Sequence, residues 1–415
     1  MRLQITVQRV CIRISTDAIY SFCWKVCTLI KQRDKEIFLN LLSGAVTGKT
    51  DLFVPDDTDF KALYHISCAH NVTGTVYFAL RDYAPKSETE KMVYSHFKKH
   101  CNFVRKSLAI QDYYTELVCG LCREKGIKFA LLKGAVIKNL YPDAAMRSSC
   151  DVDILVDRER IDEIIKSLCD MGFDYHEEKD ADESKHAKLE KDGVVLELHR
   201  KLCVDGEFQG HYNEPFSVMK SLDGVEYSFS PEELYVYNLA HACGHFMKGV
   251  NTIRAICDGY LIKKTYTDMD KAIVSQLLEK TELLDFEKGM SNLTQAVFGT
   301  KKAEGKLATV LDYVLMNPVR ADTALAELQR EKVSGKAGGV KKSSVVFRRV
   351  FPSYEFICRR YPNAKKSRLL YPFYAVKRFI DANKRGRVKE QFDAVGRISD
   401  DEIRTLDVVR KYVGL

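Results

Sequence analysis

Two acidic residues stand at the start of a segment that otherwise has the composition of a buried strand. The stretch "SSCDVDILVD" (148–157) places Asp151 and Asp153 two positions apart, followed by apolar residues. Side chains alternate between the two faces of a strand, so both carboxylates point the same way. Two carboxylates close together repel each other, and a shared divalent cation relieves that repulsion. The pattern therefore predicts a Mg²⁺ site, with Mn²⁺ as the second candidate ion.

A third acid lies in a later segment. In "VVLELHRKL" the residues Glu197 and His199 alternate with apolar neighbours. If this strand pairs with the strand of the two aspartates, Glu197 stands beside them. Three carboxylates can hold two divalent ions, one activating an attacking hydroxyl and one neutralising a triphosphate and its leaving pyrophosphate. The candidate catalytic residues, which are also the candidate metal ligands, are Asp151, Asp153 and Glu197.

A phosphate site is predicted at the turn in "LLKGAVI". Gly134 would let backbone N–H groups approach phosphate oxygens at the start of a helix, and Lys133 would add a positive charge. Arg147 lies four residues before Asp151. It could contact phosphate or form a structural salt bridge, and both interpretations stay open. We name Lys133, Gly134 and Arg147 as candidate nucleotide-binding residues.

Two further motifs have histidines or cysteines at suggestive spacing. His241 and His245 in "HACGH" share a helix face, but the motif lacks the glutamate that a zinc protease uses as its base. Packed helix histidines are the simpler interpretation. Cys119 and Cys122 form a single C-x-x-C without a second pair at zinc spacing, which favours an ordinary helix face.

Hydrophobic periodicity predicts the elements that position these residues. Helical spacing runs from about residue 17 to 83, interrupted by the turn-rich "VPDDTD", and again from Ser87 to Lys125, where Gly126 is placed to end the helix. The short apolar run "KFALLK" (128–133) is typical of a buried strand, and "AVIKNLY" continues with helical spacing. We therefore expect an α-helical first third, followed by strand, turn and helix.

The later segments repeat this change of period. "RERIDEIIKSLCDMG" (158–172) predicts a helix, and Asp192-Gly193 is a hairpin signal inside "HAKLEKDGVVLELHRKL" (186–202). From Ser230 to about residue 328 the pattern is helical again, and "VSGKAGGVKKSS" (333–344) has the composition of a linker. We expect helices on both sides of a small sheet.

Composition excludes some classes of protein. The chain of 415 residues is 46% apolar, enough for two or three domains, and lacks the run of about 18 apolar residues that a membrane span needs. Thirteen scattered cysteines suit a reducing compartment better than a disulfide framework, so we expect a cytoplasmic protein without membrane association. Residues 331–390 contain 17 Lys or Arg against four acids. This stretch could hold a polyanion such as RNA, but solvated helix faces are favoured.

The motifs together resemble a known family. The order "LLKGAVIKNLYPDAAMRSSCDVDILVD", "LELHRKL", "LAHACGH" and "RAICD" is similar to the uncharacterised nucleotidyltransferase family of bacteria, a branch of the DNA polymerase beta-like nucleotidyltransferase superfamily. The resemblance covers about residues 35–390. It implies an α+β fold: a small mixed-sheet nucleotidyltransferase core flanked by N-terminal and C-terminal α-helical regions. The segments expected are 1–125 (helical region), 126–228 (nucleotidyltransferase core), 229–330 (helical domain beside the cleft) and 331–415 (basic helical region).

The resemblance also implies roles for individual residues. Asp151 and Asp153 match the family's metal ligands, and Glu197 lies at the position of its third carboxylate. Many superfamily members carry Gly-Ser after the first strand, where this chain has Gly134-Ala135. Candidate second-site residues beside the cleft are His199, His241, His245, Arg254 and Asp258.

Two functions remain open on these grounds. The first is a Mg²⁺-dependent nucleotidyltransferase that moves an NMP group from an NTP such as ATP to a hydroxyl acceptor, which could be a small molecule, a protein or an RNA end. The second is a non-catalytic nucleotide-binding or regulatory protein that retains the fold. Retention of all three acids favours the enzyme, because clustered charge costs stability when no metal is bound.

Overall fold

The structure is a computed structural model, and it describes most of the chain. The predicted linker at 333–344 and the start of the first predicted helical stretch lie outside the described residues. These described residues are 30–49, 52–176, 186–202, 209–247, 249–318, 353–361, 363–364, 367–384 and 399–415.

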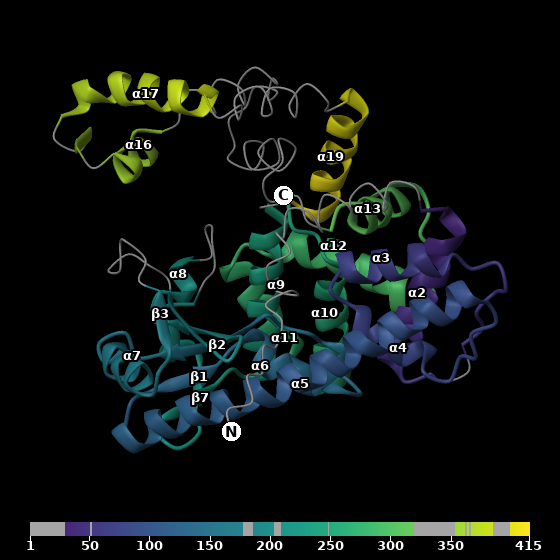
Figure 1. The fold of residues 1–415 in the computed structure, drawn as a ribbon, viewed down its shortest axis with the longest axis horizontal. Helices are drawn as coiled ribbons and strands as arrows, with labels where there is room; N and C mark the ends of the chain where they lie inside the picture. The colour runs from purple at the N-terminus through teal and green to yellow at the C-terminus, as the bar shows by residue number, and fades with distance from the viewer. Residues whose placement is uncertain are drawn as a thin grey trace, which may run out of the picture.

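A seven-stranded mixed sheet forms the centre of the α/β part, in the order β3-β4-β5-β2-β1-β7-β6 (Figure 1). Strand β2 pairs in parallel with β5 and antiparallel with β1, and β4 and β5 form an antiparallel hairpin. The predicted α+β fold is confirmed. The strands are β1 (Phe129–Leu131), β2 (Asp151–Val156), β3 (Asp174–His176), β4 (His186–Lys191), β5 (Val194–His199), β6 (Lys220–Ser221) and β7 (Glu226–Ser228).

Helices precede, connect and follow these strands. Those up to the end of the sheet are α2 (Gln32–Thr47), α3 (Phe60–Ala69), α4 (Thr73–Leu80), α5 (Glu88–Lys125), α6 (Lys133–Ile137), α7 (Ile161–Asp170) and α8 (Gln209–Tyr212), with 3₁₀ turns η1 (Lys138–Leu140), η2 (Ala144–Met146) and η3 (Pro215–Val218). Those after it are α9 (Pro231–Met247), α10 (Ile253–Thr265), α11 (Lys271–Lys280), α12 (Leu284–Phe298), α13 (Gly305–Met316), α16 (Tyr354–Arg360), α17 (Tyr371–Lys384) and α19 (Asp400–Val413), with η5 (Arg368–Leu370).

Local signals in the sequence set the ends of the main elements. The Ser87 hydroxyl accepts a hydrogen bond from the Glu90 N–H at the start of α5, and Gly126 ends that helix with φ 62°. In the β4–β5 turn, Asp192 and Gly193 have φ values of 51° and 77°, the positive values that a two-residue hairpin requires. The helix, strand and hairpin predictions for these segments are confirmed.

Three short strands do not follow from the sequence pattern. β3, β6 and β7 are two or three residues long, too short for an alternating pattern to stand out. β7 pairs in parallel with β1, so it extends the sheet on the side away from β2. The segment "AVIKNLY" also differs, because the helix α6 gives way to the 3₁₀ turn η1.

The sheet separates two apolar clusters. Val152, Ile154 and Val156 of β2 pack with residues of α5 and α7 on one face. Leu155 belongs to a second cluster, which contains residues of α2–α4, α9–α13 and α19. Residues from the first, third and fourth predicted segments therefore belong to one apolar cluster. The predicted boundaries between these segments stay a prediction. No helix among the described residues is long and apolar enough to cross a membrane.

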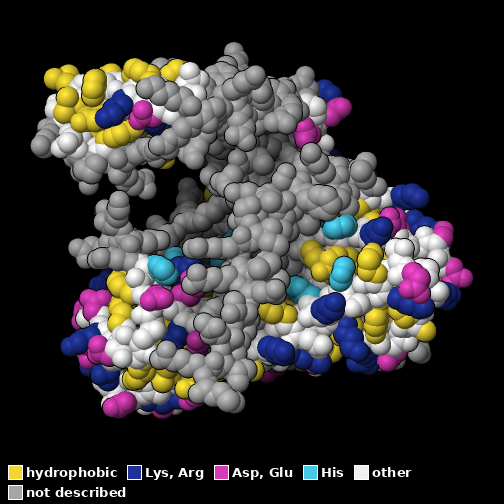
Figure 2. All heavy atoms as spheres, viewed as in Figure 1, with side chains coloured by type: hydrophobic (Ala, Val, Ile, Leu, Met, Phe, Trp, Pro, Cys, Tyr) yellow, Lys and Arg dark blue, Asp and Glu magenta, His cyan; other side chains and the backbone are white. Residues whose placement is uncertain are grey.

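The segment around α16 and α17 has a small apolar cluster of its own, which contains Ile357 and Ala375. Figure 2 shows hydrophobic side chains gathered over α17, where Phe373 and Val376 are exposed. Basic groups lie among them, since Lys377 Nζ stands 5.8 Å from the Tyr361 ring centroid. The binding of a polyanion by the basic stretch stays a prediction.

A buried histidine joins three helices of the larger apolar cluster. His70 follows α3; its Nδ1 accepts a hydrogen bond from the Ile253 N–H at the start of α10, and its Nε2 lies 3.0 Å from the Leu315 carbonyl oxygen. The ring is fully buried, so Nδ1 accepts and Nε2 donates only in the neutral form. Burial lowers the pKa of His70 to about 4 from its ordinary value of 6.5.

We expect His70 to make the fold sensitive to acid. Between pH 6.5 and 4 the unfolded chain takes up a proton at this residue and the folded chain does not, so the free energy of unfolding falls as the pH drops. At about 1.4 kcal/mol per pKa unit, the loss is about 3 kcal/mol. Urea denaturation of wild type and His70→Gln across this pH range checks it. Equal pH dependence in both proteins would contradict the assignment.

The hairpin turn gives a second prediction about stability. Gly193→Ala should lower the free energy of unfolding by about 1 kcal/mol, because a side chain is unfavourable at φ 77°. Gly120→Ala is the matched control: Gly120 lies inside α5 with open space around the added carbon, so alanine should stabilise the helix by about 0.5–1 kcal/mol. Urea midpoints of the two variants should move in opposite directions.

Candidate functional site

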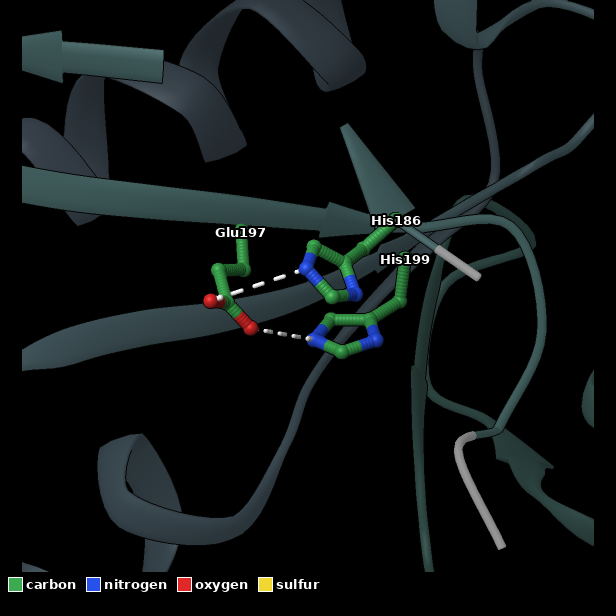
Figure 3. A group of neighbouring side chains, drawn as sticks. All are labelled: His186, Glu197 and His199. Atoms are coloured by element: carbon green, nitrogen blue, oxygen red, sulfur yellow. Dashed lines mark ion pairs between the residues drawn. The ribbon is translucent and has the colours of Figure 1, made fainter. Parts of the chain in front are cut away.

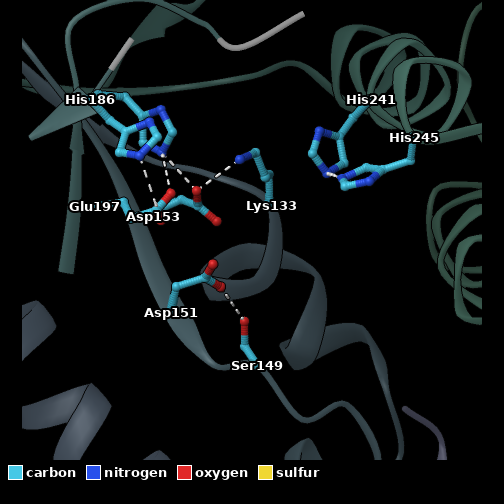
Figure 4. A network of polar contacts seen from close by, with 9 residues as sticks. Lys133, Ser149, Asp151, Asp153, His186, Glu197, His241 and His245 are labelled. Atoms are coloured by element: carbon cyan, nitrogen blue, oxygen red, sulfur yellow. Dashed lines mark hydrogen bonds and ion pairs between the residues drawn. The ribbon is translucent and has the colours of Figure 1, made fainter. Parts of the chain in front are cut away.

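The predicted acids lie side by side on one face of the sheet. In the parallel pairing of β2 with β5, Asp153 stands opposite Glu197, and Asp151 stands opposite Val195. Alternation puts all three carboxylates on the face opposite to Val152 and Ile154. Figure 4 shows Asp151, Asp153 and Glu197 directed into one region of the molecule. The neighbouring strands and the shared face expected from the sequence are therefore present.

Asp153 is the most buried of the three acids, at 5% exposure. Its Oδ1 accepts from Lys133 Nζ at 2.7 Å and lies 2.7 Å from His199 Nε2. Burial by itself would raise the pKa of Asp153, but the hydrogen bond with His199 and the charge of Lys133 outweigh it and lower the pKa. Asp153 is therefore a carboxylate at neutral pH.

Asp151 and Glu197 are half-buried and differ in their partners. Asp151 Oδ1 accepts a hydrogen bond from Ser149 Oγ at 3.0 Å. Glu197 lies near two imidazoles, with His186 Nε2 at 3.6 Å and His199 Nε2 at 3.7 Å. Burial raises the pKa of Glu197 most; the charge of His186 opposes this, and the negative charges of Asp151 and Asp153 add to it. Glu197 therefore experiences the like-charge repulsion expected from the sequence.

Lys133 is the first residue of α6, which follows β1 closely, and its backbone is strained. Its φ of 42° is unusual for a residue with a side chain, and such backbone costs about 1–3 kcal/mol. Its Nζ forms an ion pair with Asp153 Oδ1 at 2.7 Å. The residue predicted to hold phosphate thus pairs with a predicted metal ligand.

Gly134 makes room for the loop that leads into β2. A Cβ atom on Gly134 would lie 2.7 Å from Arg147 Nη1 and 3.2 Å from Ser149 Oγ. Distances below 3.0 Å essentially never occur for real Cβ atoms. A side chain at this position would have to displace the guanidinium of Arg147, so glycine allows the loop to pack closely, in addition to any role in phosphate binding.

Arg147 forms a buried ion pair with Asp258 of α10. Its Nε and Nη2 donate to Oδ1 and Oδ2 of Asp258, both at 2.9 Å, and Tyr141 OH donates to the same carboxylate at 2.7 Å. Arg254, one turn earlier on α10, donates to the Ser148 carbonyl oxygen at 2.9 Å. Of the two roles left open for Arg147, the structural salt bridge is formed. Arg254 and Asp258 fix the loop before Asp151.

His241 and His245 contact each other on α9. Their Nε2 atoms are 3.0 Å apart, and the rings meet edge to face. Burial lowers the pKa of His241 well below 6.5, and the charge of Lys133 lowers it further. Figure 4 shows Lys133 between this pair and the acids. The pair therefore faces the site instead of packing into the core.

A cavity of about 450 Å³ brings most of the predicted residues together. Its lining combines the acids and the cations with apolar side chains. The predicted residues that line it are Lys133, Gly134, Arg147, Asp151, Asp153, Glu197, His241, His245, Arg254 and Asp258. The apolar lining residues include Ile137, Phe246, Phe286, Met290, Leu293 and Val314.

His186 was not among the predicted site residues. It stands opposite His199 in the β4–β5 pairing, on the same face as Glu197 (Figure 3). The ligand atoms of His186, Glu197 and His199 all lie within 4.8 Å of one another. The Asp192-Gly193 turn fixes this register, so the hairpin signal in the sequence could have placed His186 beside His199 and Glu197.

The C-x-x-C motif has the structural role favoured from the sequence. Cys119 and Cys122 are buried in α5 and pack against the sheet. Burial raises the pKa of both thiols to about 12. Thiols of this kind are inert.

Comparison with known proteins identifies the family. A model of the family described as uncharacterised nucleotidyltransferase matches residues 56–299, more than half of the chain. The chain therefore belongs to the uncharacterised nucleotidyltransferase family. This membership supports nucleotidyl transfer as its general activity. Neither the curated proteins nor the solved structures contain a match to the chain.

The ion pair behind the site gives a prediction. Asp258→Ala should lower the free energy of unfolding by about 3–5 kcal/mol, because it leaves the buried Arg147 charge without its partner. The control is Glu88→Ala, which breaks the exposed pair with Lys91 and should cost at most about 1 kcal/mol. Urea denaturation measures both. A loss at Asp258 as small as that at Glu88 would show that the pair does not fix the loop.

Proposed function

We propose that this chain is a Mg²⁺-dependent nucleotidyltransferase that moves an NMP group from an NTP to a hydroxyl acceptor and releases pyrophosphate. The observation that carries the proposal is the placement of Asp153 and Glu197 opposite each other on parallel strands, with Asp151 on the same face of the sheet. All three line a cavity that also contains Lys133 and Gly134. Family membership supports the reaction class.

The three acids fit the divalent ion that the family implies. Their oxygens are the hard donors that Mg²⁺ and Mn²⁺ accept. Burial and, to a smaller extent, the charges of Asp151 and Asp153 raise the pKa of Glu197, and a bound cation would offset both effects. Asp151 and Asp153 would hold two ions, and Glu197 one of them. When bound, the ions would activate the acceptor hydroxyl and neutralise charge on the triphosphate.

The remaining residues have positioning roles in this proposal. Lys133 Nζ holds Asp153 in place and lies at the cavity, where it can exchange this carboxylate for a phosphate oxygen. Glu197 stands opposite Asp153 and would help to take the proton of the acceptor hydroxyl. His241 and His245 line the same cavity beyond Lys133, as second-site residues that would face the bound substrates. The acceptor could be a small molecule, a protein side chain or an RNA end.

The test is incubation with each labelled NTP, with Mg²⁺ or Mn²⁺, in the presence of cell extract. Wild type should transfer label, and Asp153→Asn should lower the rate at least about 100-fold, since even an outer partner of a metal ligand contributes about 10–100-fold. The matched control is Asp174→Asn on the exposed strand β3, which makes the same change of charge outside the cavity. It should leave the rate unchanged.

Calorimetry with NTP and Mg²⁺ separates the proposal from its alternative. Tight nucleotide binding without any labelled product would identify a non-catalytic nucleotide-binding protein. Equal labelling by wild type and Asp153→Asn would show that the acids have no catalytic role. Mass spectrometry of the labelled product gives both the group added and its acceptor.

A further inference from the structure

Two histidines and a glutamate meet on neighbouring strands beside the predicted acids. Glu197 Oε1 lies 3.6 Å from His186 Nε2, and its Oε2 lies 3.7 Å from His199 Nε2. Figure 3 shows both rings directed towards this carboxylate. The described residues contain this one group of three His, Cys, Asp or Glu side chains with ligand atoms within 4.8 Å. The spacing suits a single ion, because metal bonds of about 2.0–2.2 Å put two ligand atoms about 3–4 Å apart.

The backbone holds the three side chains in place. Glu197 and His199 are two positions apart on β5 and share a face, and His186 is the cross-strand partner of His199. The two-residue turn fixes the register of this hairpin. His199 is 1% exposed, so packing restricts its ring. A site built on paired strands keeps its ligands in place, and to bind an ion His199 Nε2 has to exchange its hydrogen bond with Asp153 for the metal.

We propose that His186, Glu197 and His199 bind a divalent first-row transition-metal ion in preference to Mg²⁺. Imidazole nitrogen is a preferred ligand of zinc, iron and nickel, whereas Mg²⁺ takes oxygen ligands. Two histidines with one glutamate are a known donor set for zinc.

This site differs from the Mg²⁺ site of the proposed reaction in its donors. It uses two nitrogen ligands that the three-acid arrangement lacks, and it shares Glu197 with that arrangement. The three ligands of this site all come from β4 and β5. The site can therefore bind its ion whether or not the chain transfers nucleotides.

The experiment measures metal binding by the full chain without nucleotide. Protein treated with a chelator is dialysed against Zn²⁺ alone or Mg²⁺ alone, and affinity is measured by calorimetry. We expect one Zn²⁺ per chain that excess Mg²⁺ does not displace. His186→Gln should weaken Zn²⁺ binding at least about tenfold, because loss of a direct ligand costs more than loss of an outer partner.

Two histidines provide matched controls. His176 of β3 also lies near a glutamate, with Nε2 3.7 Å from Glu190, but it belongs to no such group of three. His176→Gln should bind Zn²⁺ as wild type does. His245→Gln tests the other histidine pair and should also leave binding unchanged. A loss of Zn²⁺ binding at His245 but not at His186 would overturn the proposal.

A measurement on wild type covers the case in which His186→Gln does not fold. Bound Zn²⁺ should protect His186 from modification by diethylpyrocarbonate, read by mass spectrometry, and should leave His176 reactive. Equal modification of His186 with and without Zn²⁺ would overturn the proposal. Asp151→Asn separates the two sites, because it should abolish nucleotidyl transfer and retain Zn²⁺ binding. Zn²⁺ binding by wild type without any transfer would instead refute the proposed function alone.

Discussion

The constraint on which the site depends is the repulsion between carboxylates held close together on a half-buried face of a sheet. Water cannot screen these charges well, so cations and hydrogen-bond donors must face them. Lys133 and His199 do this for Asp153, and Ser149 does it for Asp151. For Glu197, burial raises the pKa most, and the charges of Asp151 and Asp153 raise it further. The strained backbone at Lys133 follows from the same constraint, since the turn brings its ammonium group to Asp153.

The helical part of the chain holds the acids in position through α10. Asp258 binds the guanidinium of Arg147, and Arg254 binds the backbone at Ser148, so two successive residues before β2 are fixed from one helix. A buried pair of this kind contributes little net stability compared with an apolar replacement, but it is costly to break. Its effect is to specify one position of the loop. Gly134 completes the arrangement by leaving space for the same loop.

The sequence predicted what depends on local chemistry. The alternation of Asp-Val-Asp, the Asp192-Gly193 turn and the end of α5 at Gly126 were all correct, because each depends on a few neighbouring residues. Pairing across the chain was harder. Arg147 and Asp258 are 111 positions apart, and no pattern in either segment predicts that they form an ion pair. The strands β3, β6 and β7 were missed because two or three residues are too few to show the alternating hydrophobic pattern of a strand. His186 was overlooked although the hairpin register places it opposite His199.

Helix α5 limits how the protein can move. Val93 and Phe97 near its beginning belong to the larger apolar cluster, and Val118 and Cys122 near its end pack under the sheet (Figure 1). The 38 residues of this helix span about 57 Å at 1.5 Å per residue. It connects the sheet, which carries the three acids, with the helices that supply the other residues lining the cavity. A hinge between these two parts would have to bend α5, so the length of this helix fixes how the sheet and the helices that line the cavity are separated.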